Sequence, residues 1–223
     1  MKYPLIVFII FYFFGITARA QTDSLSTKYR EDQFYISLAM MLQDQGIAGF
    51  KQNGFSNNFQ IGFVRDFPLN KNGNIALGLG LGYGFSRLTS NLSLVGVPAV
   101  ARPIFLVNEN EKNRQTFSTI SFPIAFRWRT STHDKTAFWR IYGGLKYNFN
   151  FGSQFQSALP EVNDVVDYIR KSNSTLFLSA GYNTWNMYLE YDLNSIYRST
   201  FELADGTTPK LRTLKIGLIF YLL

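Results

Sequence analysis

The sequence predicts an all-β protein, an eight-stranded antiparallel transmembrane β-barrel of the outer-membrane type preceded by a signal peptide. Three observations lead to this prediction. The 223 residues include 22 Phe, 13 Tyr and 3 Trp, yet the mean hydropathy is only −0.04. Apolar and small or polar residues alternate with period two in eight segments, which indicates strands. The connections between these segments are alternately short and long, as in outer-membrane barrels.

The first twenty residues resemble an export signal. Lys2 precedes an apolar run over 5–16, and Ala18-Arg19-Ala20 supplies a small-x-small cleavage pattern. We expect a Sec-type signal peptide over 1–20, cleaved between Ala20 and Gln21, and one barrel domain over 21–223; an uncleaved N-terminal anchor is the alternative. After Gln21 no apolar run approaches 18 residues. A mature chain that enters a membrane must therefore do so as a closed barrel.

The clearest strand covers 74–85. Its odd-numbered positions from Ile75 to Phe85 are large and apolar, whereas the even-numbered positions from Ala76 to Gly84 are alanine or glycine. Glycine weakens a strand, so four glycines on one face need a reason. A narrow barrel gives one, because small residues leave room for bulky neighbours across the lumen.

Seven further segments alternate in the same way. We expect the eight strands at 34–43, 59–64, 74–85, 119–128, 139–151, 176–182, 187–194 and 213–222. Short links are expected at 68–73, 131–135 and 183–186. Longer links are expected at 44–57, 88–115, 152–173 and 195–210. Both ends of the barrel chain would then lie on the periplasmic side.

Charged residues separate the membrane barrel from a soluble calyx, whose inner face would be apolar and whose outer face polar. Here one face carries a set of charges and the opposite face is nearly free of them, so we expect these charges in the lumen: Arg127, Arg140, Lys146, Glu190, Asp192 and Lys215. Arg129 is expected lower, near the periplasmic rim. Ion pairs filling a narrow lumen are one interpretation; a polar conduit or binding cleft is the other.

The composition excludes several chemistries. Zero cysteines exclude disulfides, thiolate metal sites and cysteine nucleophiles, and a single histidine excludes mechanisms that need two imidazoles. His133 falls in an expected turn, without the partners that an acyltransferase would need. The run from Gly78 to Gly82 lacks the Lys-Ser/Thr ending of a phosphate loop. No catalytic, cofactor-binding or metal site is predicted, and the modest net charge of +7 shows no nucleic-acid patch.

Two long links contain unexpected apolar residues. The link 88–115 has six that either form a docking surface for a partner protein or belong to a strand extension and pack against neighbouring loops: Leu94, Val95, Val97, Ile104, Phe105 and Leu106. In 160–171, Val162, Val165, Val166 and Ile169 have helical spacing, which predicts a short amphipathic helix over the barrel mouth. Outer-membrane lipid and lipopolysaccharide are the other expected partners.

Several stretches resemble the PorT family of outer-membrane barrels of the Bacteroidetes, which is associated with type IX secretion and, in gliding species, with motility. The resemblance covers nearly all of the mature chain except the two long outer loops. The stretches that carry it are 31–35, 60–68, 74–83, 126–132, 138–142, 181–186 and 214–218. The most specific are Arg127-Trp128-Arg129-Thr130-Ser131-Thr132 and Gly181-Tyr182-Asn183-Thr184-Trp185-Asn186.

The resemblance implies a non-enzymatic role in protein transport across the bacterial outer membrane, through contacts with proteins of the secretion machinery. It transfers no catalytic residue. Since eight strands cannot pass a folded protein, a contact role agrees with the expected barrel size. A structural, adhesion or ligand-binding barrel unrelated to secretion is an alternative, and a narrow solute channel is another.

Overall fold

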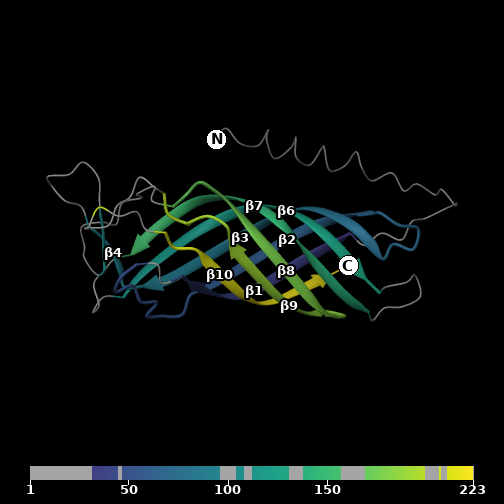
Figure 1. Ribbon diagram of the computed structural model, residues 1–223, viewed down its shortest axis with the longest axis horizontal. Coiled ribbons are helices and arrows are strands. Elements are labelled where there is room, and N and C mark those ends of the chain that lie inside the picture. The colour runs from purple at the N-terminus through teal and green to yellow at the C-terminus, as the bar shows by residue number, and fades with distance from the viewer. Residues whose placement is uncertain are drawn as a thin grey trace, which may run out of the picture.

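Eight strands close into an antiparallel barrel in the computed structural model, which describes residues 32–44, 47–95, 104–107, 112–130, 138–156, 169–198, 206 and 210–222 (Figure 1). The barrel strands are β1 (Gln33–Gln43), β2 (Asn57–Pro68), β3 (Ile75–Ser90), β6 (Asn113–Arg129), β7 (Trp139–Gln156), β8 (Ser172–Tyr182), β9 (Trp185–Asp192) and β10 (Thr213–Leu222). The predicted fold class is confirmed. The predicted signal peptide and its cleavage site at Ala20 and Gln21 lie outside the described residues.

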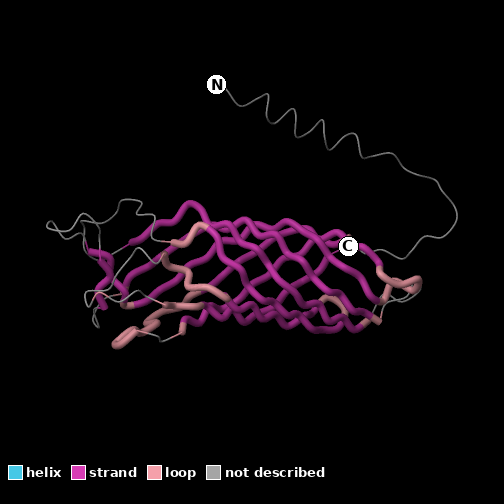
Figure 2. The backbone as a smooth tube through the Cα atoms, turned by 45° about the horizontal axis from the view of Figure 1, so that its top comes forward, coloured by secondary structure: helices cyan, strands magenta, loops and turns pink. Residues whose placement is uncertain are grey.

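The barrel is an up-and-down meander closed by its first and last strands. Each strand pairs with the next barrel strand along the chain, and β1 pairs with β10 from Phe34↔Leu222 to Gln43↔Thr213. The strands cross the barrel at a tilt, which Figure 2 shows as a lattice of crossing tubes. Closure leaves no edge strand in the wall, as a lipid-embedded sheet requires.

The two ends of the barrel differ in their connections. At the short-turn end, β8 and β9 are joined by two residues, of which Asn183 has a φ of 54°, a left-handed conformation that asparagine tolerates. At the long-loop end, β4 (Leu92–Val95) and β5 (Ile104–Val107) form a separate two-stranded sheet. β1 begins and β10 ends at the short-turn end, which in outer-membrane barrels faces the periplasm.

Five strands extend further toward the long-loop end than the sequence predicts, among them β2 from Asn57 and β8 from Ser172. β3 continues to Ser90, β6 begins at Asn113 and β7 continues to Gln156. The expected links 88–115 and 152–173 were therefore too long. In β7 the strand passes through a bulge at Gly152, whose φ is 59°: Phe151 pairs with Ser118 and Gln154 with Thr116. The predicted strand ends before Gly152. In the structure the pairing continues past this glycine, because a bulge adds a residue to one strand without ending the pairing.

The wall separates apolar and polar residues as predicted. Large side chains point outward along every barrel strand, for example Phe34, Leu81, Trp139 and Met187, each more than half exposed. Facing inward, Gly62 and Gly82 lie against the ring of Tyr35, and a Cβ atom at Gly62 would lie 2.5 Å from Tyr35 Cζ. Glycine on this face therefore makes room for a buried tyrosine, which explains the glycine-rich strand.

Candidate functional site

The middle of the lumen holds one carboxylate between two ammonium groups. Glu190 on β9 accepts from Lys146 of β7 at 2.9 Å and from Lys215 of β10 at 2.5 Å. Gln60 of β2 donates to Glu190 at 3.2 Å and accepts from Lys146 at 2.9 Å. The hydroxyl of Tyr188 also bonds to Glu190 and Lys146. We call these five residues the central cluster; they join four strands across the barrel.

The short-turn half of the lumen contains a second group built on Asp66. Its two carboxylate oxygens accept from Arg127 and Arg129, two inward-facing residues of β6. Arg127 also donates to the Gln33 side chain on β1. We call Gln33, Asp66, Arg127 and Arg129 the short-turn cluster. All four side chains are 1% exposed or less, so the ion pairs lie away from bulk water.

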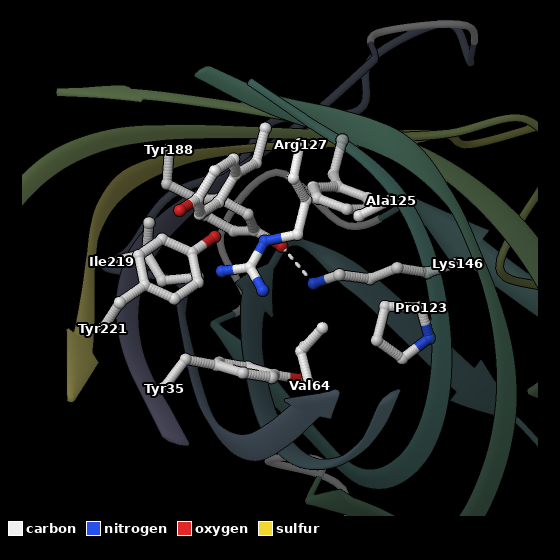
Figure 3. Close-up of a pocket in the computed structure, with 11 residues that line it drawn as sticks. Tyr35, Val64, Pro123, Ala125, Arg127, Lys146, Tyr188, Ile219 and Tyr221 are labelled. Atoms are coloured by element: carbon white, nitrogen blue, oxygen red, sulfur yellow. Dashed lines mark hydrogen bonds between the residues drawn. The ribbon is translucent and has the colours of Figure 1, made fainter. Parts of the chain in front are cut away.

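Aromatic rings fill the space between the two clusters. The rings of Tyr142 and Tyr221 meet edge to face at 5.2 Å, and Arg127 lies 4.0 Å above the Tyr142 ring. Figure 3 shows the end of Arg127 reaching this space from the top and the end of Lys146 reaching it from the right, with Tyr35 below. The cavity they line measures about 20 Å³, room for about one water molecule. The hydroxyls of Tyr35 and Tyr142 have no hydrogen-bond partner among the described residues.

An apolar plug covers the long-loop end of the lumen. It combines inward-facing residues of β1, β3, β6 and β7 with residues of the loops: Met41, Ile47, Phe50, Leu88, Leu92, Phe117, Phe155, Ile169, Ile196, Tyr197 and Leu211. Burial raises the pKa of Tyr197 to about 12, so its hydroxyl stays protonated and donates to Gln115 at 2.8 Å. The short-turn cluster, the aromatic layer, the central cluster and the plug follow one another along the described part of the lumen.

All six residues predicted as lumen charges lie on the inner face and are buried. Lys146, Glu190 and Lys215 meet in the central cluster. Asp192 lies two residues further along β9 and accepts from Asn173 at 3.3 Å. Arg127 instead belongs to the short-turn cluster, and Arg140 stands apart from both.

Asp66, the partner of the arginines, is not among the predicted site residues. The inward face of Gln60, Gly62 and Val64 continues to Asp66, because β2 extends beyond the predicted strand end at residue 64. Gln33 was missed because the first strand was started one residue later. Arg129, expected near the rim, lies at the short-turn end but is fully buried against Asp66.

The predicted docking loop is only partly described. Leu94 and Val95 lie on β4, and Ile104, Phe105 and Leu106 lie on β5, where Leu94 pairs with Phe105 and Val95 with Ile104. Val97, His133 and the predicted helix up to residue 168 lie outside the described residues. Ile169, at its far end, forms an isolated β-bridge with Tyr197 instead.

Stretches far apart in the sequence meet at the short-turn end of the lumen. Asp32, Asp66, Arg127, Arg140 and Asn186 come from five of the stretches that resemble PorT. Asp32 accepts from the Asp66 backbone N–H at 3.1 Å, and Asp66 binds Arg127. By register, Arg140 pairs with Gly181, which pairs with Asn186. Five of the seven stretches therefore contribute a residue to this end of the lumen.

Neither a membrane-spanning helix nor a metal site accompanies this lumen in the described residues. No helix there is long and apolar enough to cross a membrane. No group of three His, Cys, Asp or Glu side chains is placed there to hold a metal ion.

The closed antiparallel wall, its apolar exterior and its ion-paired interior define an outer-membrane β-barrel. The chain belongs to the family described as the outer membrane protein beta-barrel domain, whose model matches residues 19–198. The match ends before β10, the strand that closes the barrel onto β1.

Two other comparisons were made. No curated protein matches the chain. Among solved structures, the chain is similar to a mutant of the porin of Rh. blastica, with 9% identity over 87% of this chain and 100% of that one; the TM-score is 0.16. At this TM-score we draw no argument from the similarity.

Proposed function

We propose that the protein is a non-enzymatic outer-membrane component of type IX protein secretion, and of gliding motility where that occurs, acting through protein–protein contacts. The resemblance to PorT supports the secretion role. The observation that supports action by contact is the filled lumen: the two clusters, the aromatic layer and the apolar plug leave a central cavity of about 20 Å³. Such a space is far too small for a polypeptide.

The partners in this proposal are membrane lipid, lipopolysaccharide and proteins of the secretion machinery. Two surfaces are candidates for the protein contact. The first is the β4–β5 hairpin at the long-loop end, with the predicted contact residues Leu94, Val95, Ile104, Phe105 and Leu106. The second is the short-turn end, where the PorT-like stretches meet. The first would face the cell exterior and the second the periplasm.

A clean deletion of the gene tests the role. We expect the deletion strain to retain secretion cargo in the periplasm and, in a gliding species, to lose motility. Normal export and motility in the deletion strain, with altered envelope integrity, would instead support a structural or adhesion barrel. A complemented strain carrying an intact copy is the control.

A crosslinked pull-down from outer membranes tests the contact surface. We expect a variant shortened over 94–107 to lose secretion subunits that the intact protein recovers, if the hairpin makes the contact. A variant shortened over 157–168, in another long loop, is the matched control. Equal recovery by all three proteins would exclude the hairpin.

Planar-bilayer recordings address the solute-channel alternative. Because the central cluster and the plug obstruct the lumen, we expect no stable conductance from the purified protein. Reproducible single-channel steps that change with Lys146→Met would favour the channel.

A further inference from the structure

Arg140 is a buried cation without a counter-charge in the described structure. Its side chain is 4% exposed, and its Nε and Nη1 atoms have no hydrogen-bond partner. Its described contacts are with aromatic rings: the guanidinium carbon lies 4.5 Å from the centre of the Phe138 ring and 5.6 Å from that of the Tyr221 ring. Buried charges are normally paired, because removing an ion from water without compensation is costly.

The carboxylates near Arg140 are engaged by other groups. Asp66 binds both Arg127 and Arg129, and its backbone N–H donates to Asp32. Glu190 is held by two lysines and Tyr188 in the central cluster. Arg127 and Arg129 are thus paired with Asp66, whereas Arg140 forms no ion pair among the described residues. Its Nε and Nη1 atoms are orphaned donors there.

An orphaned acceptor lies two strands away from these donors, at the same level of the barrel. Asn186 is fully buried, and its Oδ1 has no partner. Arg140, Gly181 and Asn186 are in register on three adjacent strands. A Cβ atom at Gly181 would lie 2.8 Å from Asn186 Oδ1, so the amide lies directly over the glycine. No side chain therefore separates the amide oxygen from the neighbouring arginine strand.

We propose that the short-turn end of the lumen binds a carboxylate that has an N–H or O–H donor beside it. Arg140 Nε and Nη1 donate to the carboxylate, and Asn186 Oδ1 accepts from the adjacent donor. A single guanidinium with two orphaned donors fits a monoanion. Phe138 and Tyr221 wall the site, and charge-assisted hydrogen bonds are strongest in such a dry setting.

The proposed ligand chemistry has two sources, both reaching the site from the periplasm. A polypeptide C-terminus offers a carboxylate next to its own backbone N–H, and a small free acyl amino acid or hydroxy acid offers the same pair. The site lies next to the β8–β9 turn and the first residues of β7. This inference is independent of the secretion role, since it depends only on the groups around Arg140.

Thermal unfolding of the full chain, refolded in detergent micelles, tests the proposal at constant ionic strength. We expect N-acetylglycine to raise the unfolding temperature of the wild type, because a ligand that binds only the folded state stabilises it. N-acetylglycinamide, which lacks the charge, should have no effect, and acetate, which lacks the donor, should have a weaker one. A hexapeptide with a free C-terminus is then compared with its amidated form and with N-acetylglycine. Tighter binding of the free peptide than of both identifies a polypeptide C-terminus as the source.

Three variants make the test specific to the site. Arg140→Gln should weaken N-acetylglycine binding by about tenfold or more, and Asn186→Leu should remove the preference over acetate. Arg65→Gln, which changes an exposed outward-facing arginine of β2, should bind like the wild type. Arg140→Met should unfold at the same or a higher temperature than the wild type in ligand-free buffer. A wild type unaffected by N-acetylglycine, an Arg140→Gln variant that binds equally well, or a strongly destabilised Arg140→Met would overturn the proposal.

Discussion

The central and short-turn clusters share one arrangement, a carboxylate between two cations, but differ in their surroundings. Around Glu190 the cations are lysines, and Gln60 and Tyr188 add hydrogen bonds. Asp192 lies nearby on the same strand, so two lysines face two carboxylates. Around Asp66 the cations are arginines, and a third buried arginine, Arg140, stands apart from them in the same half of the lumen. The centre thus has two carboxylates for its two lysines, whereas the short-turn end has one arginine without an ion pair among the described residues.

This difference is related to the position of each cluster along the barrel. The centre lies between the aromatic layer and the apolar plug, where an uncompensated charge is most costly. The short-turn end lies next to the turns, where a ligand that enters from that side can compensate a charge. We therefore interpret the central cluster as structural and the pair Arg140 and Asn186, at the short-turn end, as the functional candidate.

The largest effect is expected from removing the central carboxylate. Glu190→Gln leaves Lys146 and Lys215 buried without their counter-ion, which should cost about 3–5 kcal/mol. Urea unfolding in detergent micelles measures this loss. Glu190→Gln combined with Lys215→Met should recover part of the stability; if the single variant is as stable as the wild type, the central cluster is not structural.

A smaller loss is expected at the short-turn cluster. Asp66→Asn should cost about 2–3 kcal/mol, at or below the usual range for a buried pair, because Arg127 keeps its bond to Gln33 and the turns lie close. Folded and unfolded barrels migrate differently on cold SDS gels. The folded fraction at increasing urea concentrations therefore measures the loss of unfolding free energy. A loss greater than that of Glu190→Gln would reverse our ranking of the two clusters.

The aromatic layer between the clusters is expected to resist added volume. Gly82→Ala places a methyl group on the Tyr35 hydroxyl and should cost about 1–3 kcal/mol, the usual range for overpacking. The double variant Gly82→Ala, Tyr35→Phe removes the atom that is struck, so part of the loss should return in a double-mutant cycle. Strictly additive losses would show that the cost of Gly82→Ala does not arise from contact with the Tyr35 hydroxyl.

The smallest effects should distinguish two buried tyrosine hydroxyls. Tyr188→Phe removes a hydrogen bond to Glu190 and should cost about 1 kcal/mol. Tyr35→Phe removes a hydroxyl without a partner and should change stability by less than about 0.5 kcal/mol. Both values come from the same urea titrations, and equal losses would contradict the described hydrogen bonding.

The sequence was sufficient to predict the wall but not the contacts inside it. Period-two alternation predicts which face each residue takes, because a strand has only two faces. It does not predict which inward residues meet across the lumen, since that depends on strand register. Lys146 and Glu190 share a face by phase, but their contact follows from the pairings Lys146↔Thr175 and Thr175↔Asp192.

Strand ends and unsatisfied groups were the hardest to predict. Gly152 has the composition of a loop residue, and only the pairing on either side identifies it as a bulge. The sequence also does not predict that Arg140 lacks a partner among the described residues. It contains several carboxylates but does not show which cations they bind.

The pairing of β1 with β10 has a consequence for how the barrel is made. These strands are the first and last of the wall, yet they share a seam of ten paired positions. Until that seam forms, both strands expose unpaired backbone groups that hydrocarbon cannot solvate. A nascent or truncated chain without β10 is therefore a curled sheet with two open edges. Assembly must wait for the whole wall to be exported, and a chaperone that shields either edge would control the timing of insertion.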